Sequence, residues 1–320
     1  MTAEGEGLHR LHAWDKIALE ARVVRYRDLV PCRNAFIDTR TPGSDAKENF
    51  TIIGPGVAES PDQHVHITEA HGFNIGGARQ PPRCTNSQHS HDTGEVFIVH
   101  SGRWRFTFGE HGEDAQVDAE AGDIVSFPTH AFRGFENIGD EAGFLWSVLG
   151  GDDPGRVLWA PQVFEMAERY GLVLLENGSL VDTTLGQVAP PGIEPMPVTS
   201  REAIARLRRM RPEELGEVIA RASEAHCHGE ELVIGFGGRL PAADGFTLSR
   251  LVLQQDEASS ASSPTYPEVV FVHRGRVQVR TPDATLALSA GDTMTVPEGL
   301  ARSYASESSC AELIVVRGAD

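Results

Sequence analysis

The sequence predicts an all-β protein made of two barrels that share one plan, with helical segments before and between them. Short runs rich in Val, Ile and Phe, separated by Gly, Pro, Asn and Asp, fill the regions 50–160 and 226–320. Such spacing is typical of antiparallel barrels and sandwiches. The length of 320 residues also fits two domains of ordinary size.

The two β regions repeat the same turn residues in the same order. Each contains a glutamate, a glycine seven positions later, a Gly-Asp pair, a proline, and an arginine five positions after that proline. These residues are Glu95, Gly102, Gly122, Asp123, Pro128 and Arg133 in the first region, and Glu268, Gly275, Gly291, Asp292, Pro297 and Arg302 in the second. Because a repeat supplies its own comparison, this agreement indicates one fold used twice.

Helical spacing is confined to the segments outside these two regions. We expect residues 1–49 to form an N-terminal arm with one helix from about residue 8 to residue 25. Residues 161–225 form a helical segment between the barrels, and Ser200 is a suitable N-cap within it. The helices expected in this segment cover 163–170, 200–210 and 212–222.

Charge and composition exclude several classes of partner. The formal net charge of −18, with no cluster of Lys and Arg, would repel a nucleic-acid backbone. The first residues lack the basic and apolar regions of a signal peptide, and no stretch approaches the ~20 apolar residues of a membrane span. We therefore expect a cytoplasmic protein that binds neither nucleic acid nor a membrane. The four cysteines are scattered without a CxxC pair, which predicts reduced thiols.

His89, His91 and Glu95 form the clearest candidate site in the sequence. Residues two apart on a strand point to the same face, so these three side chains should project to one side, which in a closed barrel can be the interior. Two imidazoles and one carboxylate with open positions suit Fe(II) and O2 chemistry, and imidazole ligands also admit Mn, Co, Ni, Cu or Zn. We therefore expect one divalent transition metal in the first barrel, with Fe favoured.

The same residues resemble the two motifs of the cupin family. The run from His89 through Glu95 to Gly102 fits the first motif from its HxH onward. The second motif is matched by Gly122, Pro128 and Asn137, but it is broken at two positions. His130 stands where the family has a glycine, and Arg133 stands where it has the third histidine ligand.

In the second barrel the resemblance extends to the fold but not to the ligands. Ser262 and Pro264 occupy the positions of His89 and His91, and Arg302 again replaces the third histidine. The resemblance therefore implies two tandem cupin barrels, of the double-stranded β-helix or jelly-roll type, with metal ligands only in the first.

The missing fourth ligand leaves three alternatives open. His130 could swing in as a replacement ligand, or three protein groups could hold the metal with water filling the other positions. Arg133 could instead pair with Glu95 and leave the site without metal, since a buried carboxylate needs a partner. Where a metal binds, Arg133 becomes a candidate clamp for a carboxylate or enolate oxygen of the substrate.

Other histidines and cysteines are weaker candidates. His64 and His66 share one face of an earlier strand and could line the first barrel, and the run from His226 to His228, with Cys227 between them, has a metal-like composition. Neither group has the Glu and Gly spacing of the first motif, so we interpret both as strand or surface histidines. Cys84 is interpreted as a buried, inert thiol.

The resemblance implies a metal-dependent oxidoreductase of the dioxygenase type, because bicupins with a ligand-bearing first barrel and a degenerate second include ring-cleaving and flavonol-cleaving dioxygenases. In this interpretation His89, His91 and Glu95, with or without His130, hold the metal, and Arg133 and His130 act on a small anionic or aromatic substrate. A non-oxidative isomerase or lyase and a non-catalytic small-molecule-binding protein are the alternatives. Cupins commonly dimerise through edge strands, so a homodimer is also expected by analogy.

Overall fold

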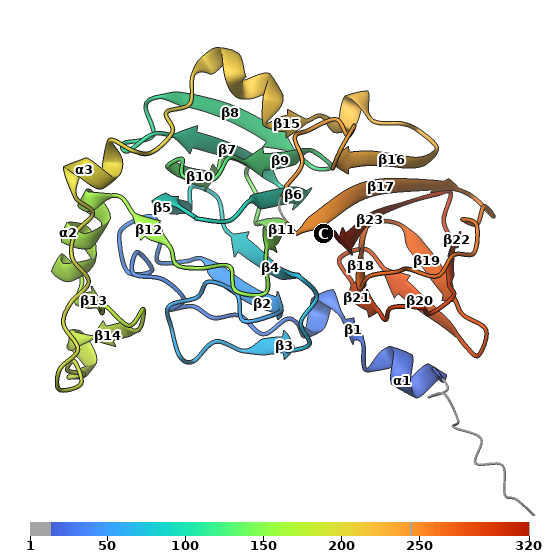
Figure 1. Ribbon diagram of the computed structural model, residues 1–320, viewed down its shortest axis with the longest axis horizontal. Coiled ribbons are helices and arrows are strands. Elements are labelled where there is room, and N and C mark those ends of the chain that lie inside the picture. The colour runs from blue at the N-terminus through green and yellow to red at the C-terminus, as the bar shows by residue number, and fades with distance from the viewer. Residues whose placement is uncertain (1–13, 244, 320) are drawn as a thin grey trace, which may run out of the picture.

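The first barrel consists of two facing β-sheets. The computed structural model describes residues 14–243 and 245–319, and Figure 1 shows two β domains side by side. A seven-stranded sheet has the order β15-β9-β6-β11-β4-β2-β3, and a five-stranded sheet has the order β12-β5-β10-β7-β8. Their strands are β2 (Glu48–Ile53), β3 (Val65–Ile67), β4 (Phe73–Gln80), β5 (Thr85–Ser90), β6 (Glu95–Ser101), β7 (Arg103–Phe108), β8 (Ala115–Glu120), β9 (Ile124–Phe127), β10 (Arg133–Asn137), β11 (Gly143–Gly150), β12 (Leu158–Trp159) and β15 (Ile219–Ala220). Side chains from both sheets, such as Phe97 and Phe106, form the core between them.

The second barrel repeats this plan with fewer strands. A six-stranded sheet, β1-β21-β18-β23-β17-β16, accompanies a three-stranded sheet, β20-β19-β22. Their strands are β1 (Val23–Val24), β16 (Gly229–Ile234), β17 (Phe246–Gln254), β18 (Glu268–Arg274), β19 (Arg276–Arg280), β20 (Thr285–Ser289), β21 (Thr293–Val296), β22 (Ser303–Ser306) and β23 (Cys310–Gly318). Val272 and Leu288 belong to its buried core. The predicted all-β fold with two tandem barrels is therefore confirmed.

The two large sheets pack against each other and join the barrels. The core between them contains Trp146 of β11 and Phe271 of β18, whose rings stack with centroids 4.8 Å apart. Trp146 Nε1 also donates a hydrogen bond to Thr293 Oγ1 at 3.0 Å. Because these sheets are buried on both faces, β6 and β18 carry four consecutive apolar residues after their glutamates instead of alternating polar residues.

Each barrel receives an edge strand from the segment that leads into the other barrel. The arm strand β1 pairs with β21 of the second barrel, and β15, from the segment between the barrels, pairs with β9 of the first. The aspartates of the repeated Gly-Asp turns anchor these segments. Asp292 accepts a hydrogen bond from Arg25 Nη1 at 2.8 Å, and Asp123 accepts one from Arg221 Nη1 at 2.9 Å.

The helix expected over residues 8–25 is much shorter in the described part of the arm. Helix α1 covers Lys16–Glu20 only, and its N-cap Asp15 accepts a hydrogen bond from the Ala18 N–H. The prediction of a helix was wrong beyond Ala21, because the chain there forms strand β1, which pairs with the second barrel. A short 3-10 helix, η1 (Tyr26–Asp28), follows β1. Residues 8–13 of the expected helix lie outside the described residues.

The segment between the barrels contains less helix than expected. Helix α2 (Pro161–Arg169) matches the prediction, and Ser200 caps α3 (Arg201–Ile204), which ends six residues before the predicted end. The prediction of a third helix over 212–222 was wrong. A 3-10 helix, η3 (Pro212–Glu217), is followed there by the strand β15. The remaining elements are a hairpin, β13 (Leu172–Leu174) and β14 (Leu180–Asp182), and the 3-10 helices η2 (Thr183–Leu185) and η4 (Ala222–Glu224).

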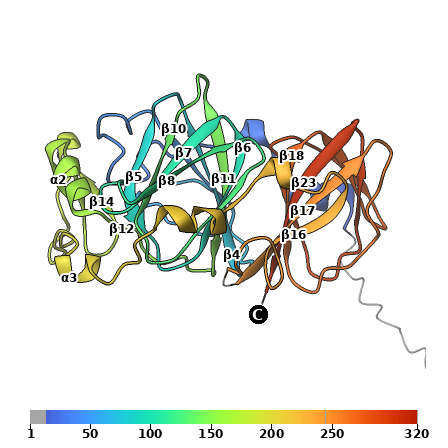
Figure 2. The same cartoon turned by 90° about the horizontal axis from the view of Figure 1, so that it is seen from above.

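Helices α2 and α3 and the hairpin cover the flank of the first barrel that faces away from the second barrel, as Figures 1 and 2 both show. They pack there through a cluster that includes Val163, Ala167, Phe132 and Trp159. None of the helices in the described part of the chain has the length and apolar character needed to cross a membrane.

Candidate metal centre

Three buried side chains of the first barrel converge on one point. His89 lies on β5, His91 directly follows that strand, and Glu95 begins β6. One ligand atom from each lies within 4.8 Å of the others, and all three residues are buried. Within residues 14–243 and 245–319, no other group of three or more His, Cys, Asp and Glu side chains is arranged for a metal ion in this way. The structure thus brings together the three candidate ligands named from the sequence.

Both histidines are held in the neutral form that binds metals. Nδ1 of His89 lies 2.7 Å from the Ser87 carbonyl oxygen, which can only accept, so Nδ1 carries the proton and Nε2 is the free ligand atom. Burial, reinforced by the positive charge of Arg133, lowers the pKa of His89 and of His91 well below the usual value. The buried Nδ1 of His91 has no hydrogen-bond partner among the residues that the structure describes.

Glu95 is paired with Arg133 but keeps one oxygen open. Arg133 lies opposite His89 on β10 and donates from Nη2 to Glu95 Oε2 at 2.6 Å. Among the described residues no hydrogen bond engages Oε1, so this oxygen remains for a metal. The Arg133 pairing weighed from the sequence therefore exists, yet it coexists with the converged ligand group.

The guanidinium of Arg133 is only partly satisfied. Its side chain is 1% exposed, and within the described part of the chain its buried Nε and Nη1 have no hydrogen-bond partner. Burial lowers the pKa of Arg133 in spite of the opposing effect of Glu95. A buried cation with two free donor groups is suited to accept an anionic group as an additional partner.

In the second barrel the corresponding Glu–Arg pair has both carboxylate oxygens engaged in hydrogen bonds. Glu268 Oε1 accepts hydrogen bonds from Arg302 Nε at 2.8 Å and from the Tyr304 hydroxyl at 2.6 Å. Its Oε2 accepts from Arg302 Nη2 and from Arg317 Nε. Burial raises the pKa of Glu268, but the hydrogen bond and charge of Arg302 and the charge of Arg317 leave it lowered. No carboxylate oxygen is left over for a metal.

A largely apolar cavity of about 70 Å³ adjoins the candidate metal site. The three converged side chains form part of its wall. Its aromatic wall residues are Phe36, Phe50, Phe97, Phe135 and Trp159. Such a cavity, apolar with a few convergent polar groups, is the usual form of a small-molecule site.

His130 does not join the three converged residues. Its side chain is 58% exposed, and Nδ1 lies 3.6 Å from Asp92 Oδ1. Its φ of 55° is in the left-handed region, which explains why the cupin motif has glycine here. Only its backbone reaches the site, through a hydrogen bond from its N–H to the His91 carbonyl at 3.1 Å.

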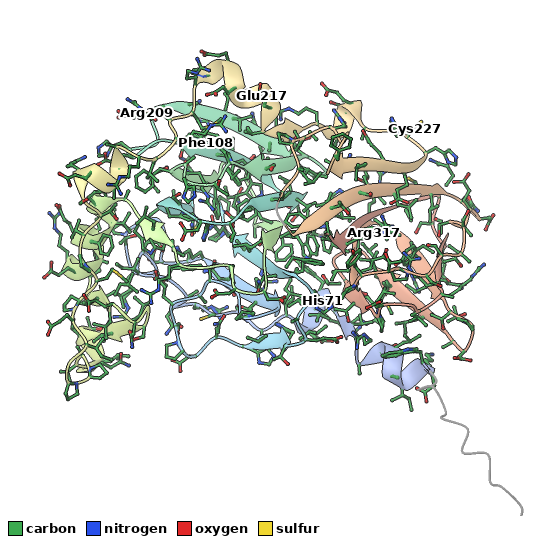
Figure 3. All side chains as sticks on the ribbon, in the orientation of Figure 1. His71, Phe108, Arg209, Glu217, Cys227 and Arg317 are labelled. Atoms are coloured by element: carbon green, nitrogen blue, oxygen red, sulfur yellow. The ribbon has the colours of Figure 1, made fainter. Side chains whose placement is uncertain are left out.

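The weaker candidates have ordinary structural surroundings. Both ring nitrogens of His66 engage backbone groups, with Nδ1 2.9 Å from the Thr51 carbonyl oxygen and Nε2 accepting from the Val30 N–H at 3.1 Å. Cys84 is buried, and burial raises the pKa of its thiol, so it is unreactive. Cys227 is exposed at the surface (Figure 3), and the neighbouring His228 contacts Glu257.

Sequence reasoning missed two groups of residues. Asp38 and Lys47, from the arm, form a buried ion pair beside β5, and nothing in their spacing signals this. His100 and His273 meet between the barrels with ring centroids 5.6 Å apart. Each stands five residues after the repeated glutamate, so the repeat itself could have identified this second pair.

Comparison with known proteins finds a cupin family match in the first barrel and a similar fold over the whole chain. The model of the cupin domain family matches residues 76–149, within the first barrel. The oxalate decarboxylase of Lactobacillus farciminis, solved as a formate complex, is 12% identical, covers 92% of this chain and 85% of its own, and superposes with a TM-score of 0.57.

Two further solved structures are similar. The oxalate decarboxylase of Bacillus subtilis at pH 4.6 is 12% identical over 93% of this chain and 76% of its own, with a TM-score of 0.57. Procruciferin, an 11S globulin from Brassica napus, is 13% identical over 77% of this chain and 76% of its own, with a TM-score of 0.51. Identities this low show the fold alone. Comparison with curated proteins finds no significant match.

Proposed function

Since this chain is a bicupin of the cupin superfamily, we propose that it is a mononuclear metal-dependent oxidoreductase of the dioxygenase type, acting in its first barrel. One observation carries the proposal. Two buried, neutral histidines and one open carboxylate oxygen converge at the wall of a cavity in the first barrel, whereas the corresponding glutamate of the second barrel is fully hydrogen-bonded.

The resident metal in this proposal is a divalent transition ion, with Fe favoured. His89, His91 and Glu95 would hold it, since neutral imidazoles and a carboxylate with open positions suit Fe(II). The buried, unpartnered Nδ1 of His91 and the orphaned donors of Arg133 are further signs that a bound group completes this site. When bound, the metal supplies activation of O2 or of the substrate.

The proposed substrate is a small anionic or aromatic molecule. The free Nε and Nη1 groups of Arg133 would orient a carboxylate or enolate oxygen. The aromatic wall of the cavity would hold a flat, apolar body and keep water away from the reacting atoms. His130 has no role in this proposal, because its ring is directed toward Asp92 and solvent.

A non-oxidative lyase is the second candidate function. Its support is the structural likeness to two oxalate decarboxylases, although that likeness rests on fold and not on matched site residues. The third alternative, a non-catalytic binding protein, draws its support from the Glu95–Arg133 contact.

Oxygen consumption separates these functions. Protein reconstituted with Fe(II) is assayed against a panel of small aromatic and anionic compounds, in air and under strict anaerobiosis, with His89→Ala as the metal-site variant. The proposal predicts oxygen uptake that requires both metal and His89. Turnover without O2 would assign the chain to the non-oxidative class, and the absence of bound metal would favour the binding protein.

A further inference from the structure

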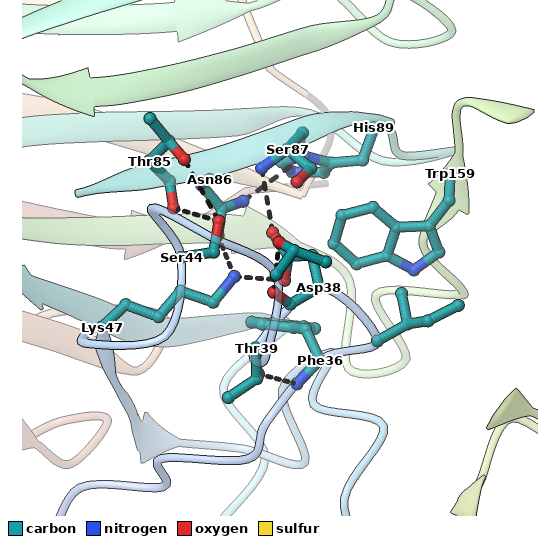
Figure 4. A network of polar contacts seen from close by, with 12 residues as sticks. Phe36, Asp38, Thr39, Ser44, Lys47, Thr85, Asn86, Ser87, His89 and Trp159 are labelled. Carbon is teal, nitrogen blue, oxygen red and sulfur yellow. Dashed lines mark hydrogen bonds and ion pairs between the residues drawn. The ribbon is translucent and has the colours of Figure 1, made fainter. Parts of the chain in front are cut away.

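A fully buried ion pair from the N-terminal arm lies against the strand that carries His89. The side chains of Asp38 and Lys47 are both 0% exposed and form a salt bridge (Figure 4). Lys47 Nζ also donates to Asn86 Oδ1 at 2.9 Å. A buried ion pair adds little stability compared with apolar side chains of the same size, because both charges lose their hydration. Stability therefore does not explain why this ion pair lies beside the candidate metal centre.

Asp38 connects to His89 through a single residue, Ser87. Asp38 Oδ2 accepts a hydrogen bond from the Ser87 N–H at 3.0 Å, and the Ser87 carbonyl accepts one from His89 Nδ1 at 2.7 Å. The amide of Asn86 is 3.5 Å from the same nitrogen, at the limit of a hydrogen bond. The Ser87 carbonyl therefore determines that Nδ1 of His89 carries the proton, and Asp38 fixes the position of the Ser87 backbone.

The arm also supports the face of the His89 ring. The ring centroid of Trp159 lies 5.2 Å from that of His89, and Trp159 Nε1 donates to Glu59 Oε1 at 2.6 Å. Glu59 Oε2 in turn accepts from the Ile37 N–H at 2.8 Å. Two successive arm residues, Ile37 and Asp38, thus reach both the packed face and the hydrogen-bonded edge of one metal-ligand candidate.

We propose that Asp38 and Lys47 are a positioning pair for the metal centre. Lys47 fixes the carboxylate of Asp38, Asp38 fixes the backbone of Ser87, and Ser87 keeps Nδ1 of His89 protonated with Nε2 presented to the metal. This inference rests on the proposed metal site. Hydrogen bonds behind a ligating histidine set its tautomer and orientation and raise its basicity. The arm thereby becomes part of the site that it covers.

Asp38→Asn tests this role, with Co2+ titrated into metal-free protein and the ring nitrogens of His89 followed by 15N NMR. We expect Co2+ affinity to fall by about 10- to 100-fold, the usual effect of losing such support. The His89 signals should lose the pure Nδ1–H pattern. Glu312→Gln is the matched control, because Glu312 pairs with Arg250 in the second barrel and both are buried. It should change Co2+ affinity by less than about twofold, since distant sites act independently.

The double variant Asp38→Ala, Lys47→Met separates positioning from folding. It leaves no unpaired buried charge, and buried ion pairs often tolerate replacement by apolar residues. The same loss of affinity in this folded variant supports the proposal. A folded variant with wild-type Co2+ affinity and an unchanged His89 tautomer overturns it. If wild-type protein binds no Co2+, the metal-site proposal fails, and the His89 tautomer in the metal-free variants still decides the positioning role.

Discussion

Arg133 Nη2 lies 2.6 Å from Glu95 Oε2, at the position where the cupin motif has its third histidine ligand. The corresponding contact in the second barrel joins Arg302 to both oxygens of Glu268. The glutamate of this Glu–Arg pair is therefore hydrogen-bonded differently in the two barrels. In the first barrel a carboxylate oxygen stays open beside two histidines, and in the second barrel the carboxylate is fully used.

Arg133→His is predicted to strengthen metal binding. Arg133 lies opposite His89 on the neighbouring strand, so a histidine there would add a ligand and remove a positive charge from beside His89 and His91. We expect the Kd for Co2+ or Mn2+ to fall by about tenfold, which corresponds to about 1.4 kcal/mol. Isothermal titration of metal-free protein measures this directly.

Arg302→His is the matched control for that experiment. Ser262 and Pro264 stand where the first barrel has its histidines, so the new imidazole would have no partner ligands. The control should gain no metal. A gain in both variants, or in neither, would contradict the assignment of the site to the first barrel.

Glu268→Gln is predicted to destabilise the protein strongly. The change removes the negative charge that neutralises Arg302, which is 3% exposed, and Arg317. Leaving buried charges unpaired costs about 3–5 kcal/mol. Urea unfolding measures this loss, and Co2+ affinity should not change. Glu230→Gln breaks an exposed contact of the same Arg317 and should cost less than about 1 kcal/mol. Equal effects of the two variants would argue against a structural role for the closed network.

The histidine pair between the barrels predicts acid sensitivity. Burial lowers the pKa of His100 to about 4, with His273 adding to the effect, and burial with the charge of Arg250 lowers that of His273 to about 4. In the unfolded chain both histidines become protonated as the pH falls through about 6.5. In the folded chain they stay neutral until about pH 4. Stability should therefore be complete above pH 6.5 and fall as the pH drops toward 4.

Urea unfolding at pH 7 and pH 5 tests this pair. Each pKa unit corresponds to about 1.4 kcal/mol, so the wild-type protein should lose at least about 2 kcal/mol over this interval. The double variant His100→Gln, His273→Gln should lose less, because two groups that charge on unfolding are gone. His111→Gln, at a side chain 59% exposed, serves as the control. Parallel pH profiles for wild type and double variant would refute the assignment.

The repeat made the two barrels and the three metal-ligand candidates predictable. Positions such as Glu95 and Glu268 could be compared within one sequence, and alternation along a strand placed His89 and His91 on one face. The boundaries assigned to the arm, the barrels and the segment between them stay predictions. The side-chain direction of His130 was not predictable, because it follows from a left-handed backbone at that residue.

The arm is where sequence reasoning failed, for a physical reason. Val23 and Val24 form a strand only because β21 offers an edge from more than 250 residues away, and local helical spacing does not record that partner. Asp38 and Lys47 look like ordinary surface charges in the sequence, yet the fold buries both. The strand at Val23 and Val24 and the burial of Asp38 and Lys47 both depend on contacts between segments that are distant in the sequence.

Metal content tests the central claim most directly. Protein reconstituted anaerobically with Fe(II), freed of excess metal and measured by elemental analysis should contain one ion per chain, lost in His89→Ala and retained in Ser262→Ala of the second barrel. Substoichiometric metal in the wild-type protein, or metal content unaffected by His89→Ala, would contradict a single metal centre in the first barrel.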